Sequence, residues 1–83
     1  MLVAERLAAC VNVIPNMRST YRWKNEIQHD EESLLIIKTT AERFAALKLA
    51  VLKIHPYELP EIIAVNLSDG HAPYLDWILA STQ

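Results

Sequence analysis

The stretch Ile54–Val65, with the sequence IHPYELPEIIAV, decides how the rest of the chain is arranged. A proline disfavours helical geometry in the residue before it, so Pro56 ends the preceding helix at His55. Pro60 acts in the same way on Leu59, and it suits the start of a strand, where a missing amide donor is tolerated. The stretch is therefore predicted to be a rigid turn between a helix and a buried strand.

The residues on either side of this turn predict a helix over Ala41–Ile54 and a strand over Glu61–Leu67. Thr39 and Glu42 have the spacing of a capping box at the start of the helix. Apolar residues then recur at the spacing of one helix face. That predicted face consists of Phe44, Leu47, Val51 and Leu52.

The first half of the chain predicts a hairpin that turns at residues 24–26. Its first strand begins at Cys10 and is expected to break at residues 15–16, because proline cannot donate to a strand ladder. Its second strand is expected over Ser33–Thr40, where apolar and β-branched residues gather. Ahead of the hairpin, Leu2–Ala9 contains good helix formers and predicts the last two turns of a helix.

A short closing helix is predicted over residues 72–82, where Pro73 suits the first turn. Strands and helices mixed in this order indicate an α+β fold. One more strand before the first helix would complete the βαββαβ pattern of a ferredoxin-like sandwich, an antiparallel sheet with helices on one face. The chain of 83 residues is expected to be a single domain over residues 1–83.

Composition excludes several classes of function. The net charge is −2 and the eight Lys and Arg residues are scattered, so we expect no nucleic-acid partner. No apolar run approaches the roughly 20 residues of a membrane helix, so we expect no membrane partner. A single cysteine excludes an internal disulfide framework and favours the cytoplasm. The sequence contains none of the common nucleophile, zinc-protease or phosphate-loop motifs, so it does not predict an enzyme.

The predicted strands carry apolar side chains on both faces. Leu34–Ile37 and Ile62–Val65 are continuous apolar runs, and successive strand residues point to opposite faces. Helices cover one face, and the other needs cover because large exposed apolar patches are uncommon on monomers. We therefore expect a closed homo-oligomer with its sheets facing inward. The alternative is that the closing helix folds across the second face.

Five segments, taken in order, resemble the CutA family, the divalent cation tolerance proteins. They are ERLAACVNVIP, SxYxWK, LLIIKTT, HPYELPEIIA and PYLDWI, and they extend from Glu5 to Ile78. The resemblance implies a ferredoxin-like subunit, a stable homotrimer packed through its sheets, and a cytoplasmic protein tied to copper and other divalent metals.

The resemblance also implies that the first strand of the family and the first half of its first helix are missing here. We expect a start codon that is assigned late, or a fragment. The alternative is that the flanking strands close the gap and pair in parallel across a right-handed helical crossover.

The candidate metal ligands are Cys10, His55, Glu58 and Glu61, for copper or another divalent cation that is bound weakly. The resemblance associates Cys10 with copper, and a thiolate is a soft ligand suited to that metal. His55 follows a helix C-terminus and is able to bind metal as a neutral imidazole. The alternatives are a buried apolar cysteine and a histidine that bonds the last carbonyl groups of the helix. His29, among acidic residues, is interpreted as part of a solvated segment.

Several aromatic residues are candidates for a ligand cleft between subunits, although such residues more often fill a core or an interface. They are Tyr21, Trp23, Tyr57 and Trp77. The sequence therefore leaves three readings open. The first is a trimeric metal-binding tolerance protein, the second is a PII-like small-molecule sensor, and the third is a trimeric scaffold without a ligand.

Overall fold

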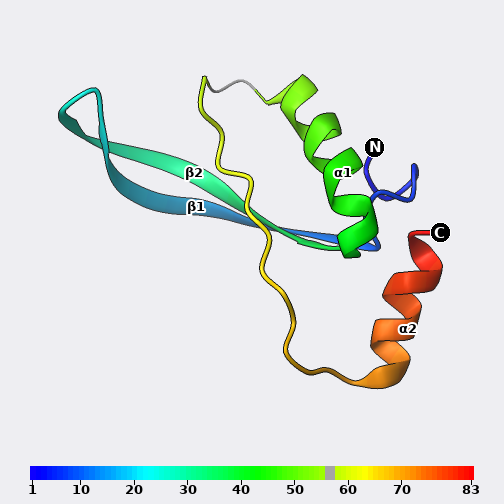
Figure 1. The fold of residues 1–83 in the computed structure, drawn as a ribbon. Helices are drawn as coiled ribbons and strands as arrows, with labels where there is room; N and C mark the ends of the chain where they lie inside the picture. The colour runs from blue at the N-terminus through cyan, green and yellow to red at the C-terminus, as the bar shows by residue number, and fades with distance from the viewer. Residues whose placement is uncertain (56–57) are drawn as a thin grey trace.

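The computed structural model describes residues 1–55 and 58–83, and in these residues the chain forms a two-stranded antiparallel sheet and two helices. The strands and helices are β1 (Cys10–Trp23), β2 (Glu26–Lys38), α1 (Ala41–Ile54) and α2 (Ala72–Ser81). The hairpin projects well beyond α1, and the molecule is 45 Å along its longest axis (Figure 1). The α+β class is confirmed.

The hairpin turn lies where the sequence predicts it. Trp23 pairs with Glu26, and the two residues between them, Lys24 and Asn25, have φ angles of 50° and 66°. Positive φ at both central positions is the geometry of a type I′ turn, whose twist matches that of the flanking strands. Asparagine adopts this conformation readily, whereas lysine does not.

The double substitution Lys24→Asn/Asn25→Gly should therefore stabilise the protein. It places the favoured Asn-Gly pair at the turn and relieves about 1 kcal/mol of left-handed strain. The measurement is chemical denaturation followed by circular dichroism. The reverse variant, Asn25→Val, is the control and should destabilise the protein. An unchanged midpoint in both variants would show that the turn adds nothing to stability.

Both strands are longer than predicted. The expected break at residues 15–16 is wrong, because β1 continues through this point with a register irregularity between Ile14 and Met17. Asn16 takes a φ of 61°, which lets the chain bulge around the missing proline donor and resume pairing. The second strand begins at Glu26 and not at Ser33, because its polar first half pairs with β1.

Helix α1 has the predicted boundaries, but its predicted cap is wrong. Thr40 is the N-cap residue, and its side chain makes no capping hydrogen bond. The hydroxyl of Thr39 instead donates to the carbonyl oxygen of Leu7 at 2.7 Å, a contact between distant segments that no local pattern reveals. On the predicted apolar face Leu47 is buried, whereas Leu52 is 46% exposed.

The predicted helix over Leu2–Ala9 is not formed. These residues make a series of turns, and Arg6 has a φ of 61°, outside helical geometry. A helix this short, without an N-cap residue, does not offset the cost of nucleation. The amino group of Met1 donates to Glu5 Oε2 at 2.8 Å, and this hydrogen bond and the positive charge lower the pKa of the Glu5 carboxyl.

The predicted strand over Glu61–Leu67 is also not formed. These residues carry no regular structure and run as a connector from the α1 side of the molecule towards α2 (Figure 1). A strand exists only through its ladder, and no described strand pairs with this segment to provide one. Sequence pattern alone therefore identified an extended apolar segment but not a paired strand.

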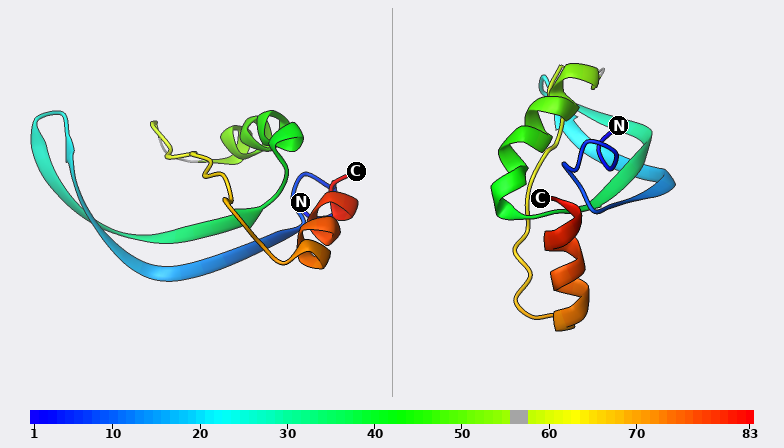
Figure 2. Two further views of the ribbon diagram at one scale, coloured as in Figure 1. Left: turned by 60° about the horizontal axis from the view of Figure 1, so that its bottom comes forward. Right: turned by 90° about the vertical axis from the view of Figure 1, so that its right-hand side faces the viewer.

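The core lies where α1, α2 and the start of β1 meet. The buried apolar residues there are Ala8, Ala9, Leu47 and Ile78. Arg43 Nε donates to the carbonyl oxygen of Thr82 at 2.5 Å and ties the two helices together. Helix α1 lies over one face of the hairpin, and α2 lies near the end where β1 begins (Figure 2). The alternative, in which the closing helix covers the other face of the sheet, is not adopted.

Candidate metal and ligand sites

Cys10 is the first residue of β1 and lies opposite Lys38. Its side chain is half-buried, and its Sγ lies 3.8 Å from Oδ1 of Asn12. The ammonium group of Lys38 donates a hydrogen bond to the same Oδ1 atom. A fixed positive charge therefore lies beside the thiol, which opposes the binding of a metal cation at this end of the sheet.

His55 is the C-cap residue of α1, and its backbone N–H donates to the carbonyl oxygen of Val51 at 2.9 Å. Its ring is half-buried and lines a groove that Glu61 also lines. Glu58 is exposed nearby in the sequence, and Tyr57 lies outside the described residues. The structure thus brings two of the four candidate ligands, His55 and Glu61, to one groove.

Cys10 does not belong to that groove. It lies near the start of α1, whereas His55 lies at the end, and a helix of 14 residues is about 21 Å long. Figure 1 shows α1 beginning beside the start of β1 and running away from it to the top of the picture. Within one chain, Cys10 and His55 therefore cannot share a metal ion.

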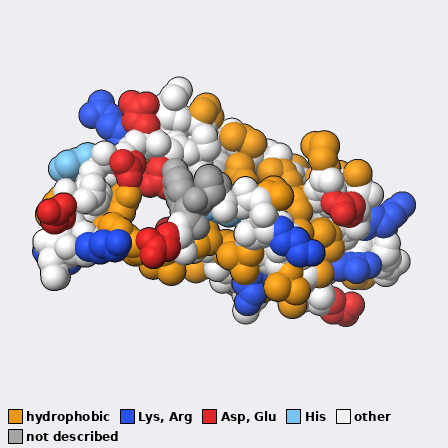
Figure 3. All heavy atoms as spheres, turned by 90° about the horizontal axis from the view of Figure 1, so that it is seen from above, with side chains coloured by type: hydrophobic (Ala, Val, Ile, Leu, Met, Phe, Trp, Pro, Cys, Tyr) orange, Lys and Arg blue, Asp and Glu red, His pale blue; other side chains and the backbone are white. Residues whose placement is uncertain are grey.

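The groove has a volume of about 1370 Å³ and is bordered by β2, α1 and the 61–67 segment. Its apolar lining includes Ile36, Phe44, Leu47 and Ile63. Hydrophobic side chains cover much of the face seen from above in Figure 3. The sequence did not predict this groove, because it is formed by segments that lie up to about sixty residues apart, from Asn16 to Ile78.

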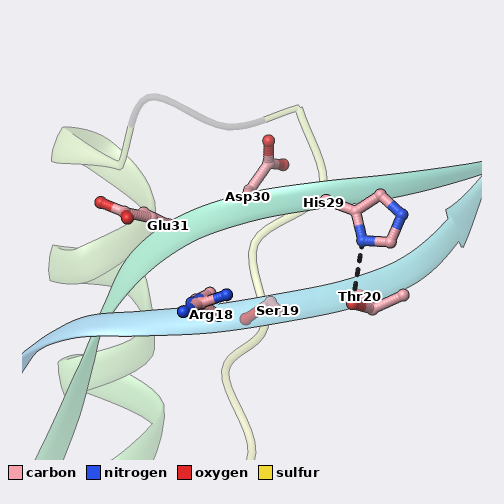
Figure 4. Close-up of a pocket in the computed structure, with 6 residues that line it drawn as sticks. All are labelled: Arg18, Ser19, Thr20, His29, Asp30 and Glu31. Carbon is pink, nitrogen blue, oxygen red and sulfur yellow. Dashed lines mark hydrogen bonds between the residues drawn. The ribbon is translucent and has the colours of Figure 1, made fainter.

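The hairpin carries a second, shallower hollow of about 380 Å³ around His29 (Figure 4). His29 Nδ1 and the hydroxyl of Thr20 share a hydrogen bond of 3.1 Å, and the hydroxyl of Tyr21 donates to Asp30. Because neighbouring strand residues point to opposite faces, the polar side chains of this segment do not converge. Among the residues described, no three His, Cys, Asp or Glu side chains form a group able to hold a metal.

The aromatic candidates lie at different ends of the molecule. Trp23 stacks under the Lys24 ammonium, 5.8 Å from its ring centre, at the tip of the hairpin. Trp77 lies 5.5 Å from Tyr74, ring centre to ring centre, on α2. Among the residues that the structure describes, Trp23 and Trp77 line no common cleft within one chain, so a cleft that both line would need a second subunit.

Comparison with known proteins decides the family. Residues 1–81 match the family described as the CutA1 divalent ion tolerance protein. The chain belongs to the CutA1 family. It is 49% identical over 81 residues to the "Divalent-cation tolerance protein CutA" of Thermus thermophilus. The aligned region covers 98% of this chain and 79% of that protein. The predicted resemblance is confirmed.

Longer CutA relatives match over only part of their length. The human "Protein CutA" is 45% identical over 82 residues, and this chain spans 46% of it. The Xenopus laevis homologue is 47% identical over 77 residues, and this chain spans 51% of it. The chain therefore spans about half the length of these vertebrate relatives.

Solved CutA structures share the fold. The Thermus thermophilus protein superposes with a TM-score of 0.95 at 49% identity, covering 99% of this chain and 80% of that one. A structure from Nostoc, titled "PII-like protein CutA", superposes with a TM-score of 0.91 at 33% identity, with the same coverage. No helix in the described part of this CutA1 chain is long and apolar enough to cross a bilayer.

Proposed function

We propose that this CutA1 chain is the subunit of a homotrimer that binds copper or another divalent cation weakly and serves in metal tolerance, without enzymatic activity. The observation that carries the proposal is the 49% identity with a relative named for divalent-cation tolerance. The single cysteine favours a cytoplasmic protein. Two plant relatives are named chloroplastic, so localisation varies within the family.

The trimer is supported by apolar side chains that one chain leaves open to water. Leu34, Leu35 and Ile36 are 38%, 47% and 43% exposed, on alternating faces of β2. Helices on one face of a ferredoxin-like sheet leave the other face to be covered. Burial of such side chains stabilises assembly by about 25 cal/mol for each Å² of apolar surface.

The metal ligands that the geometry supports best are His55 and Glu61, which line one groove. Glu58, an exposed residue close to both in the sequence, is the third candidate. Imidazole and carboxylate groups together suit copper or zinc. Cys10 lies outside this groove, and we propose that its thiolate binds metal only if a second subunit supplies further ligands.

Calorimetric titration with Cu²⁺ tests this assignment. His55→Ala combined with Glu61→Gln should weaken binding by about tenfold or more, the range for losing an important group at a metal site. His71→Ala is the matched control, because that histidine is exposed, does not line the groove, and should leave binding unchanged. Equal loss in both variants, or unchanged binding in the first, would contradict the assignment.

A second function is favoured by the Nostoc structure, whose title describes a PII-like protein. A PII-like sensor would bind a small molecule between subunits, where aromatic residues from two chains are able to meet. Thermal-shift screening separates the two functions. Stabilisation by a nucleotide and not by metals would favour the sensor. No shift in melting temperature with either nucleotides or metals would favour a scaffold.

A further inference from the structure

We propose that the outward side of α1 is a docking surface for a short, acidic amphipathic helix of another protein. The surface is an apolar stripe with a lysine on either side, and we call it the outer seam. Its residues are Ala45, Leu49 and Leu52, flanked by Lys48 and Lys53. The proposal goes beyond the metal and sensor functions above and depends on neither of them.

The outer seam lies on the side of α1 opposite its packed face. Leu47 is buried and lines the groove together with Val51, whereas none of the seam residues lines it. Because an α-helix has 3.6 residues in each turn, Leu49 and Leu52 point away from Leu47. Figure 2 shows no part of the described chain over the side of α1 that faces away from the hairpin.

The outer seam places large apolar side chains in water. Leu49 is 60% exposed and Leu52 is 46% exposed. A single exposed leucine is common on a protein surface, whereas these two are neighbours on one helix face, with Ala45 one turn before them. The trimer proposed above forms through the open face of the sheet, so it leaves this side of α1 uncovered. The seam therefore offers apolar surface to a further partner.

The spacing of the outer seam fits the side of another helix. Ala45, Leu49 and Leu52 are separated by four and then three residues, the alternation by which two paired helices stay in contact. The small side chain of Ala45 lets a second backbone approach closely. The seam covers about two turns of α1, so the partner helix is short and the association is weak and transient.

Charge selects an acidic partner. Lys48 and Lys53 lie directly outside the two leucines, at the positions whose charges pair with those of the facing helix. The Lys48 ammonium lies 5.5 Å from the ring centre of Phe44, which holds it along one edge of the seam. Neither lysine forms an ion pair with a carboxylate of the described residues. Carboxylates at the facing positions would therefore pair with both lysines.

The same charges disfavour a second copy of this chain as the occupant. Two outer seams that face each other bring Lys48 beside another Lys48 in an antiparallel pair and beside Lys53 in a parallel pair. Like charges that face each other across an interface repel. Glu42 is the only acidic residue of α1, and one carboxylate does not offset two lysines.

The experiment titrates the 83-residue protein into two fluorescent helical peptides. Both peptides have three heptads with leucine at the seam positions, and the flanking positions are glutamate in one peptide and lysine in the other. Like charges at the flanking positions keep each peptide from pairing with itself. Fluorescence anisotropy should show saturable binding of one acidic peptide to each subunit. The basic peptide should bind at least tenfold more weakly.

Exchange of the flanking charges locates the surface. Lys48→Glu combined with Lys53→Glu should weaken binding of the acidic peptide at least tenfold and strengthen binding of the basic one. Arg22→Glu combined with Lys24→Glu is the matched control, because it makes the same change in net charge at the tip of the hairpin. This control should bind the acidic peptide as the parent protein does.

A second pair of variants tests the apolar part. Leu49→Lys should weaken binding of the acidic peptide at least tenfold, whereas Leu79→Lys, at a similar exposed position on α2, should not. Equal binding of the two peptides, or no binding of either, would overturn the proposal. A doubled assembly mass that Leu49→Lys abolishes would overturn it in favour of a second copy. Binding to phosphatidylglycerol vesicles without binding to the acidic peptide would overturn it in favour of a lipid surface.

Discussion

Replacing Leu47 by alanine should lower the free energy of unfolding by about 2–5 kcal/mol, the range for truncating a buried leucine. Leu47 is 4% exposed and is one of the few buried apolar residues of the small core. A domain of this size has few large buried side chains, so each carries a large share of a total stability of about 5–15 kcal/mol. The measurement is denaturant unfolding at fixed protein concentration.

Leu49→Ala provides the matched control for this prediction. Leu49 lies on the same helix and is 60% exposed, so its truncation leaves helix propensity almost unchanged and should cost under about 0.5 kcal/mol. Equal destabilisation by the two substitutions would show that the core does not lie beneath Leu47 and that subunit contacts cover Leu49 instead.

The parts of the fold that local chemistry determines could be predicted from the sequence. The hairpin turn and the boundaries of α1 follow from residues close together in the chain, such as Asn25 at the turn and Pro56 after the helix. The capping box failed because Thr39 donates to Leu7, more than thirty residues away. Contacts of this range compete with local patterns and leave no trace in them.

Residues 61–67 show a second reason why the sequence alone did not predict the fold. Their apolar run predicts an extended, buried segment, yet Ile63 and Val65 are both largely exposed in the structure. Pattern reasoning identifies such a segment, but pairing depends on which backbone lies alongside it. The prediction of a strand here also required a neighbouring strand that pairs with residues 61–67, and the described sheet contains none.

The candidate site was only partly predictable for the same reason. His55 and Glu61 are close in sequence, and the structure brings both to one groove. Cys10 joined the candidates through the family resemblance, and its separation from His55 depends on the length of α1. The Lys38 ammonium beside Cys10 arises from strand register, which no spacing in the sequence reveals.

Replacing Val13 by lysine should convert the proposed trimer into monomers. Val13 lies opposite Leu35 across the β1–β2 ladder, and the two side chains are 59% and 47% exposed. Such cross-strand apolar pairs stabilise a sheet when they are covered. A lysine at this position would bring an unpaired charge into the interface, which costs several kcal/mol in each of the three subunits.

Sedimentation velocity at micromolar concentration measures this outcome, because the sedimentation coefficient separates trimer from monomer. Leu49→Lys introduces the same charge at a similarly exposed position on α1 and should leave the mass unchanged. A trimer that persists in Val13→Lys would place the interface on another face, and a monomeric parent protein would reject the trimer. Loss of the trimer with retained Cu²⁺ binding would further show that His55 and Glu61 act within one subunit.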